Sequence, residues 1–189
     1  MTQILFINGP SGSGKDTVSG FVKKCSPAHV CEEKLSWPLK SGLAHMFRLK
    51  PEFVEKLEKK KDIDQPLFNN RSWREMQIRL FRDYFLPTFG AEVFGTMLLN
   101  RIQIRENSGT QYRTYVISDC GKYEECMPIV NKFLPIRCRH AEITREGFDW
   151  GTDYRVPIAL DGIDKETIEN RFDLEIFEVQ IRQMFGDWV

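Results

Sequence analysis

Residues 4–20 read ILFINGPSGSGKDTVSG: an apolar run, a glycine-rich turn and the beginning of an amphipathic segment. The apolar run has no charged residue, which is typical of a strand buried on both faces in a parallel sheet. Apolar residues return after the turn at helical spacing. The turn, from Gly9 to Lys15, has the spacing Gly-x-x-x-x-Gly-Lys, so the stretch predicts a strand, a phosphate-binding loop and a helix.

The residues of this loop suit a phosphate ligand. Glycines let the backbone approach phosphate oxygens closely, and the amides at the start of the following helix supply positive potential. Lys15 adds a mobile cation that can reach the β- and γ-phosphates of a nucleoside triphosphate. We expect Asp16 to contribute its amide, because its carboxylate would repel phosphate and suits the helix dipole instead. The expected phosphate-binding residues are Gly9, Gly12, Ser13, Gly14, Lys15, Asp16 and Thr17.

The composition indicates a globular protein without an excess of either charge. The chain has 189 residues, 41% of them hydrophobic and 29% charged, and its formal net charge is +0. Surfaces for duplex DNA or an anionic membrane need excess positive charge, so we expect neither partner. No apolar run approaches the roughly 18–20 residues that span a bilayer, and the N-terminus does not have the pattern of a signal peptide. The five cysteines form no Cys-x-x-Cys pair, which indicates reduced thiols in a cytoplasmic protein.

Strand-like and helix-like segments alternate along the chain. The segments that we expect to be strands are 3–8, 29–36, 112–119, 133–139 and 166–170. Strands separated by helices predict an α/β fold, with a central parallel sheet of about five strands flanked by helices. We expect one domain over residues 1–189, with a helical insertion at 38–105 that carries binding groups.

Three local signals set the ends of the expected helices. Ser72 and Glu75 have the spacing of a capping box, so a helix is expected to begin there. Pro87 is expected to end that helix, because proline cannot continue the hydrogen-bond ladder. Asp173 is placed to cap a C-terminal helix.

The order Gly-Lys-Asp-Thr differs from the common loop, in which Ser or Thr follows the lysine directly. It resembles adenylate kinase and its relatives, whose threonine is displaced in the same way, and looks most like the deoxynucleoside monophosphate kinases of tailed phages. Four further stretches resemble that family in the same order: 35–47, 89–102, 116–125 and 169–181. The matching positions are Pro38, Leu39, Lys40, Leu43, Gly90, Glu92, Asp119 and Glu125. The chain departs from the family at Gly121, where the family has arginine, and Lys122 lies beside it.

The resemblance implies the P-loop kinase fold, ATP and Mg²⁺ as cofactors, and a mobile lid, which we place at residues 140–156. The residues expected to bind the acceptor are Lys40, Gly90, Glu92, Asp119 and Lys122. Those expected to hold Mg²⁺, largely through water, are Thr17 and Asp119. Arginines of a lid can clamp the transferring phosphoryl group, so the expected catalytic residues are Lys15, Arg139, Arg145 and Arg155. Arg155 belongs to Asp153-Tyr154-Arg155, which resembles the family's Asp-Ser-Arg.

These features predict a kinase that transfers phosphate from ATP to a (deoxy)nucleoside monophosphate such as dTMP or dGMP, supplying DNA precursors. The resemblance implies the cytoplasm of a phage-infected bacterial host, and it leaves a homodimer open. One alternative is a P-loop kinase of another small phosphorylated metabolite, for example dephospho-coenzyme A. Another is a nucleotide-binding interaction module without turnover, which the glycine at position 121 would favour.

Overall fold

The computed structural model of the chain describes residues 1–151, 155–171 and 173–189, which form two compact units. The first unit comprises Met1–Leu35 and Phe94–Val189, and the second comprises Ser36–Val93. The expected insertion at 38–105 therefore differs from the second unit, which ends at Val93.

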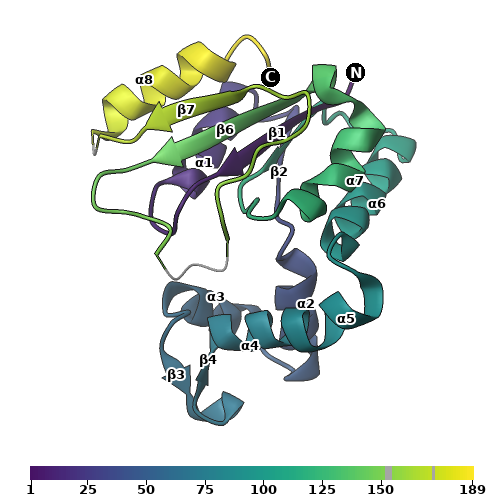
Figure 1. Ribbon diagram of the computed structural model, residues 1–189, viewed down its shortest axis with the longest axis vertical. Helices are drawn as coiled ribbons and strands as arrows, with labels where there is room; N and C mark the ends of the chain where they lie inside the picture. The colour runs from purple at the N-terminus through teal and green to yellow at the C-terminus, as the bar shows by residue number, and fades with distance from the viewer. Residues whose placement is uncertain (152–154, 172) are drawn as a thin grey trace. The chain divides into compact units, whose positions relative to one another are not determined.

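The first unit contains a five-stranded parallel sheet, as predicted, with the strand order β2-β5-β1-β6-β7 (Figure 1). Its strands are β1 (Gln3–Asn8), β2 (Val30–Glu33), β5 (Thr114–Ile117), β6 (Cys138–Thr144) and β7 (Lys165–Glu169). All five residues of β1 from Ile4 to Asn8 are buried, because the strand lies in the centre of the sheet with helices on both faces.

Helices cover both faces of this sheet (Figure 1). They are α1 (Lys15–Cys25), α6 (Val93–Asn107), α7 (Tyr123–Phe133) and α8 (Leu174–Phe185). α1 and α8 pack on each other and on one face, where Phe21 and Phe177 meet edge to face with their ring centroids 6.2 Å apart. On α6, a Cβ atom at Gly95 would lie 2.0 Å from the carbonyl oxygen of Glu125, so glycine allows α6 and α7 to approach closely.

Strand β6 differs from the expectation. Of the expected strand 133–139, residues 133–137 are not in a strand: Phe133 ends α7, Leu134 has a φ of 65°, and Pro135–Arg137 form a short 3₁₀ helix. The strand begins at Cys138 and continues to Thr144, pairing with β1 and β7. Residues 140–144, which we assigned to a lid, are therefore part of the sheet, because strand pairing on both sides outweighs the apolar pattern upstream.

The second unit is mainly helical. Its elements are α2 (Trp37–Met46), α3 (Pro51–Lys59), β3 (Asp64–Gln65), η1 (Pro66–Phe68), β4 (Arg71–Ser72), α4 (Trp73–Leu80), the π-helical turn η2 (Phe81–Phe85) and α5 (Leu86–Phe89). A cluster of Leu43, Leu57, Phe68 and Trp73 forms its core. The hydroxyl of Ser72 accepts a hydrogen bond from the Glu75 amide at 3.1 Å, so the predicted N-cap of α4 is confirmed.

The helical run that begins at Trp73 ends near Pro87, as expected, but it continues two residues past the proline. A π-helical turn follows α4 and leads into α5, which contains Pro87 in its first turn and ends at Phe89. The wider turn accommodates the residue that lacks an amide hydrogen. Gly90, with a φ of 86°, ends the helical run.

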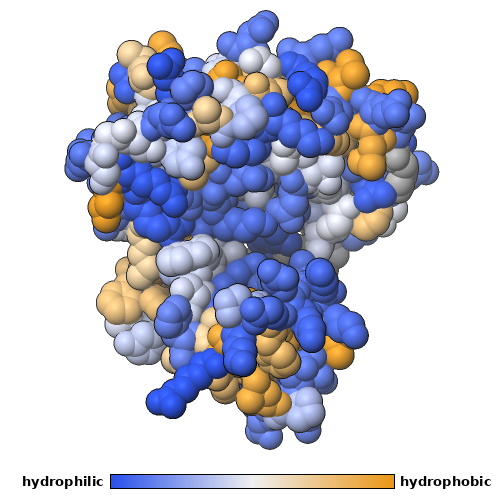
Figure 2. All heavy atoms as spheres, turned by 180° about the vertical axis from the view of Figure 1, so that it is seen from behind, coloured by the Kyte–Doolittle hydropathy of each residue, from blue (hydrophilic) through white to orange (hydrophobic). Residues whose placement is uncertain are grey.

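No helix among the described residues is both long and apolar enough to cross a membrane. The face shown in Figure 2 is mostly hydrophilic, with hydrophobic residues in small separate groups. Such scattered groups are normal on protein surfaces.

Candidate functional site

The glycine-rich loop that we expect to bind phosphate joins β1 to α1, and this strand–loop–helix order is as predicted. Gly12 and Gly14 have φ values of 81° and 107°, in the left-handed region that glycine adopts without strain. The ammonium of Lys15 donates hydrogen bonds to the carbonyl oxygens of Gly9 at 2.7 Å and Pro10 at 2.5 Å, and only 7% of this residue is exposed. The lysine thus lies across the inside of the loop, where its charge is available to a bound phosphate.

Ser13 and Asn170 build the inner side of the loop. Ser13 is fully buried, and its hydroxyl has no hydrogen-bond partner among the described residues. Asn170 follows β7; its side-chain amide donates to the Ser13 carbonyl at 2.9 Å, and its backbone amide donates to the Thr144 carbonyl at 2.8 Å. A Cβ atom at Gly14 would lie 2.6 Å from Nδ2 of Asn170, so this hydrogen bond requires glycine in the loop. The buried hydroxyl is a polar atom that a phosphate oxygen would satisfy.

Asp16 and Thr17 lie in the first turn of α1. One carboxylate oxygen of Asp16 lies 2.6 Å from the ammonium of Lys34 and accepts a hydrogen bond from the hydroxyl of Ser118 at 3.1 Å. Burial raises the pKa of Asp16, but Lys34 and Ser118 outweigh burial, so the pKa is lowered. The carboxylate thus has cationic and hydroxyl partners, and the amide at this position remains the group that we expect to face phosphate.

The end of β5 brings Asp119 and Lys122 into the first unit near the loop. Oδ1 of Asp119 accepts a hydrogen bond from the Leu35 amide at 2.8 Å, which ties the end of β5 to the end of β2. Lys122 has extended backbone and is the N-cap residue directly before α7. Within the first turn of α7, burial raises the pKa of Glu125 to about 7, with Asp119 contributing in the same direction and Lys122 opposing it. The strand end therefore carries an acidic pair of which one member can keep its proton near neutral pH.

Arg155 lies against the backbone of Gly121. A Cβ atom at Gly121 would be 2.1 Å from Cγ of Arg155, and the Val156 amide donates to the Gly121 carbonyl at 3.1 Å. The buried side-chain amide of Asn8, the residue before the loop, donates to the carbonyls of Cys120 at 2.8 Å and Val156 at 3.2 Å. The position that lacks the expected arginine is thus covered by an arginine from another segment.

Arg145 is the second arginine that the structure brings to the loop. Its guanidinium donates to the Gly12 carbonyl at 3.0 Å and lies 4.7 Å from the centroid of the Phe148 ring. A Cβ atom at Gly12 would lie 2.5 Å from that ring, so the turn after β6 packs directly on the loop. This contact supports a covering role for the turn 145–148, the part of the expected lid that follows the strand.

The expectation that Arg139 clamps a phosphoryl group is not supported, and we correct it. Its guanidinium donates to the Met184 carbonyl at 2.8 Å, pairs with Glu166 at 3.0 Å and lies 5.2 Å from the centroid of Phe185. Met184 and Phe185 hold it at the C-terminal end of α8, and Glu166 holds it to the neighbouring strand β7. Arg139 pairs with Leu5 near the start of β6, whereas the loop follows the carboxyl end of β1. Arg139 serves packing rather than the loop.

The second unit holds Lys40, Gly90 and Glu92. The ammonium of Lys40 lies 2.6 Å from Oε2 of Glu58, whose other oxygen accepts a hydrogen bond from the buried indole of Trp73 at 2.6 Å. Burial raises the pKa of Glu58, but its bonds to Lys40 and Trp73 outweigh burial and lower it. Lys40 is therefore engaged in an ion pair, while Glu92 is exposed.

Sequence reasoning assigned no role to Asn8, Lys34, Ser118, Phe148 or Asn170. One signal was available: Asn8, Ser118 and Asn170 each stand at the carboxyl end of a predicted strand, the edge at which α/β proteins place ligands. Phe148 gave no such signal, because its contact with Gly12 joins residues more than a hundred positions apart. Asp153 and Tyr154, which resemble part of a family motif, lie outside the described residues.

Comparisons with known proteins address the fold. No protein-family model matches the chain, and no curated protein matches it. Among solved structures, a putative kinase from Chloroflexus aurantiacus is 11% identical, covers 96% of this chain and 97% of its own, and has a TM-score of 0.50. A Thermus thermophilus protein is 14% identical, with coverages of 100% and 98% and a TM-score of 0.49.

A third solved structure, a sugar kinase from Janibacter in its unliganded form, is 11% identical, with coverages of 97% and 94% and a TM-score of 0.47. At these identities the likeness concerns the fold and not the substrate. The chain thus has an α/β fold with a five-stranded parallel sheet, and this fold is similar to that of the putative kinase from Chloroflexus aurantiacus.

Proposed function

We propose that this protein is an ATP-dependent kinase that phosphorylates a (deoxy)nucleoside monophosphate to the diphosphate. The observation that carries the proposal is the loop from Gly9 to Lys15: left-handed glycines, a buried lysine and a helix that begins at the lysine. Backbone amides at such a helix start bind phosphate oxygens, and lysine neutralises their charge.

The loop residues fit ATP. The unsatisfied hydroxyl of Ser13 and the ammonium of Lys15 offer hydrogen bonds to phosphate oxygens in place of the loop's own carbonyls. Arg145, at 3.0 Å from the Gly12 carbonyl, and Arg155, over Gly121, are the arginines that would neutralise the transferring phosphoryl group. Transfer then depends on positioning and charge, which these side chains supply.

The residues also fit a magnesium ion that keeps much of its water shell. The described residues contain no group of three or more His, Cys, Asp or Glu side chains arranged to hold a metal. Thr17 in the first turn of α1 and Asp119 at the end of β5 are the groups that would contact such water. Mg²⁺ is commonly held by substrate phosphates, one or two protein groups and water, and it supplies charge neutralisation during transfer.

Lys40, Gly90 and Glu92 are proposed for the acceptor on the basis of the family resemblance, with Asp119 and Lys122. For Lys40 to hold an acceptor phosphate, the anion must compete with or replace Glu58. The second candidate, a P-loop kinase whose acceptor is another small phosphorylated metabolite, requires the same competition at Lys40.

A coupled assay of ADP release across a panel of acceptors tests the proposal. The panel contains dTMP, dGMP, dephospho-coenzyme A and gluconate, each with Mg²⁺-ATP. Stimulation by a nucleoside monophosphate is the expected result. Stimulation by dephospho-coenzyme A or gluconate alone would replace the proposed acceptor, and tight ATP binding in calorimetry without any stimulation would indicate a binding module.

A further inference from the structure

The outer edge of β7 is an open pairing surface. β7 is the last strand of the sheet and pairs with β6 on one side (Figure 1). The Asn170 amide donates to the Thr144 carbonyl, so alternation along the strand directs the backbone groups of Lys165, Thr167 and Glu169 away from β6. Among the described residues, no backbone hydrogen bond reaches these outward groups. Such an edge is a template for another strand unless it is protected.

The charges along this edge are complementary to themselves. The side chains of Lys165, Thr167 and Glu169 lie on one face of the sheet, and all three residues are exposed. Within the chain, Lys165 pairs with Glu142 at 2.7 Å and Glu169 pairs with Arg171 at 2.8 Å, so a second copy would share these charges with partners on the same chain. In an antiparallel pair of two copies centred on Thr167, each Lys165 lies directly opposite Glu169 of the second copy. Opposite charges at directly facing positions stabilise a strand pair, whereas like charges destabilise it. In this register, the three residues whose backbone groups point away from β6 are also the residues that exchange backbone hydrogen bonds with the second copy.

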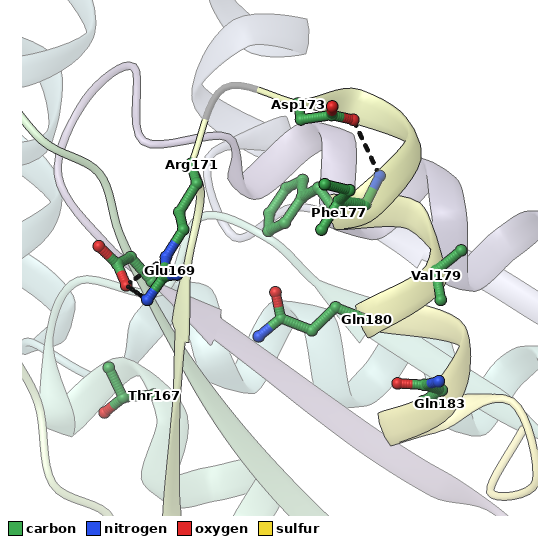
Figure 3. A pocket seen from close by; sticks show the side chains of 9 residues that line it. Thr167, Glu169, Arg171, Asp173, Phe177, Val179, Gln180 and Gln183 are labelled. Atoms are coloured by element: carbon green, nitrogen blue, oxygen red, sulfur yellow. Dashed lines mark hydrogen bonds and ion pairs between the residues drawn. The ribbon is translucent and has the colours of Figure 1, made fainter.

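A groove runs beside the same edge, between β7 and α8 (Figure 3). Its volume is about 540 Å³, and its lining includes Thr167, Ile176, Val179, Gln180 and Gln183. The side chain of Gln180 points from α8 toward β7 (Figure 3). Ile176 and Val179 are 64% and 53% exposed, so α8 carries apolar side chains along this groove.

Symmetry links the groove to the edge. A two-fold axis that pairs β7 with its copy in antiparallel fashion is perpendicular to the sheet, so both copies of α8 lie on the same face. The two grooves, whose lining includes Ile176 and Val179, then adjoin across the seam. Apolar side chains beside a strand pair supply the burial that main-chain hydrogen bonds alone do not.

We propose that the β7 edge and the adjoining α8 groove form the interface of a symmetric homodimer, in which two five-stranded sheets join into one continuous sheet. The occupant of the edge is a second copy of this chain, because antiparallel pairing about Thr167 places the positive Lys165 of each copy opposite the negative Glu169 of the other. The proposal is independent of the enzymatic function.

Sedimentation of the full chain over a range of concentrations, with charge-reversal variants, tests this interface. Glu169→Lys places lysine opposite Lys165 and is expected to weaken the dimer at least about tenfold, since like charges face each other. The double variant Lys165→Glu/Glu169→Lys again places opposite charges across the seam, but the reversed charges then face Glu142 and Arg171 within each chain. It is therefore expected to restore part of the dimer that Glu169→Lys loses. Glu55→Lys, an exposed reversal of equal charge on α3, is the matched control and leaves the dimer unchanged. Thermal melting establishes that each variant is folded.

Hydrogen exchange locates the interface independently. The Thr167 and Glu169 amides are expected to exchange slowly in the dimer and faster on dilution, while the Ile168 amide, which faces β6, is unaffected. Thr167→Pro removes an outward amide without removing a bond to β6, and it is expected to give a folded monomer. The proposal is wrong if the wild-type chain sediments as a monomer throughout. It is equally wrong if a dimer shows fast exchange at these amides, or if the double reversal restores none of the dimer that Glu169→Lys loses. Capture of a foreign strand with no self-association would assign the edge to another protein.

Discussion

The side chain of Arg155 lies over Gly121, with its Cγ 2.1 Å and its own Cβ 2.5 Å from the position that a Cβ atom on Gly121 would take. Gly121 stands where the similar phage kinases have an arginine, so an arginine reaches this place from a different part of the chain. Asn8, between the carbonyls of Cys120 and Val156, holds the two segments together. A glycine that looked like a loss in the sequence is thus what admits Arg155.

Gly121→Ala is expected to displace Arg155 and to lower kcat of the proposed transfer about 100-fold, because misplacing a positioned group by about 1 Å has effects of that size. The KM for ATP should change little, since the loop itself is untouched. Steady-state kinetics measure both constants. Gly20→Ala on α1, where an added Cβ meets nothing within 4 Å, is the matched control. Wild-type kcat in Gly121→Ala would contradict the role of Arg155.

Arg145 and Arg139 should behave in opposite ways. Arg145→Ala removes the guanidinium beside Gly12 and is expected to lower kcat by roughly 100- to 1000-fold, the usual effect of a lost charge-stabilising donor. Arg139→Ala should leave kcat unchanged and lower the unfolding free energy by about 1 to 2 kcal/mol, because its stem and charge pack on Phe185. Kinetics combined with denaturant unfolding separate the two, and the reverse pattern would restore Arg139 to the site.

Lys15→Ala is expected to abolish most phosphoryl transfer while the protein stays folded, because the ammonium faces the ligand side of the loop. Lys24→Ala, an exposed lysine on the same helix, is the control and should retain wild-type turnover. ADP release and a thermal melt are the two measurements. Turnover that survives in Lys15→Ala would remove this lysine from the mechanism.

The stability of the fold should fall in mild acid because of His140. This residue is fully buried in β6, and burial, followed by the charge of Lys165, lowers its pKa to about 4, with Glu142 opposing them. The unfolded chain, with an ordinary pKa near 6.5, takes up a proton in a pH range where the folded chain does not. The contribution of His140 to the free energy of unfolding is therefore fully present above pH 6.5 and declines as the pH falls toward 4.

Between pH 7 and 5 the corresponding loss is about 2 kcal/mol of unfolding free energy. His140→Phe, of similar size and without a titrating group, should not show this loss. Urea unfolding of both proteins at the two pH values gives the difference directly. An equal acid dependence in wild type and variant would show that another group is responsible.

Glu125 should change the stability of the fold with pH in the opposite direction to His140, so that the free energy of unfolding falls as the pH rises. Burial raises its pKa to about 7, so the folded chain keeps a proton that the unfolded chain, with a pKa near 4.5, releases. Its contribution is present at pH 5 and is lost as the pH rises through 7, with a decrease of about 2 to 3 kcal/mol. Glu125→Gln should remove this decrease and be more stable than wild type at pH 8 in urea unfolding. If wild type and variant lose equal stability toward pH 8, the carboxyl group is ionised in the folded protein.

Patterns that depend on neighbouring residues were predictable from the sequence. The strand before Gly9, the loop and the helix after it follow from an apolar run and fixed glycine spacing. The caps at Ser72 and Asp173 were also predicted, and the carboxylate of Asp173 accepts hydrogen bonds from the Glu175 and Ile176 amides at 3.0 Å. Each of these signals lies within a few residues of the structure that it sets, so no distant contact can change it.

Strand β6 shows where such reasoning stops. The stretch 133–139 is more apolar than Cys138–Thr144, yet the latter pairs with β1 and β7. A strand in the middle of a sheet is stabilised by hydrogen bonds to the strands on both sides. These bonds depend on distant segments, so the sequence of the strand itself does not reveal them. The same shift turned Arg139 away from the loop and left Arg145 beside it.

By itself, the sequence determined the phosphate loop, the helix that follows it and the alternation that makes a parallel α/β sheet, because backbone conformation and burial there depend on local residues. Tertiary structure decided which arginines reach the loop, which partner holds Lys40 and which strand edge stays open. These depend on groups far apart in the chain, whose approach is set by the packing of strands and helices.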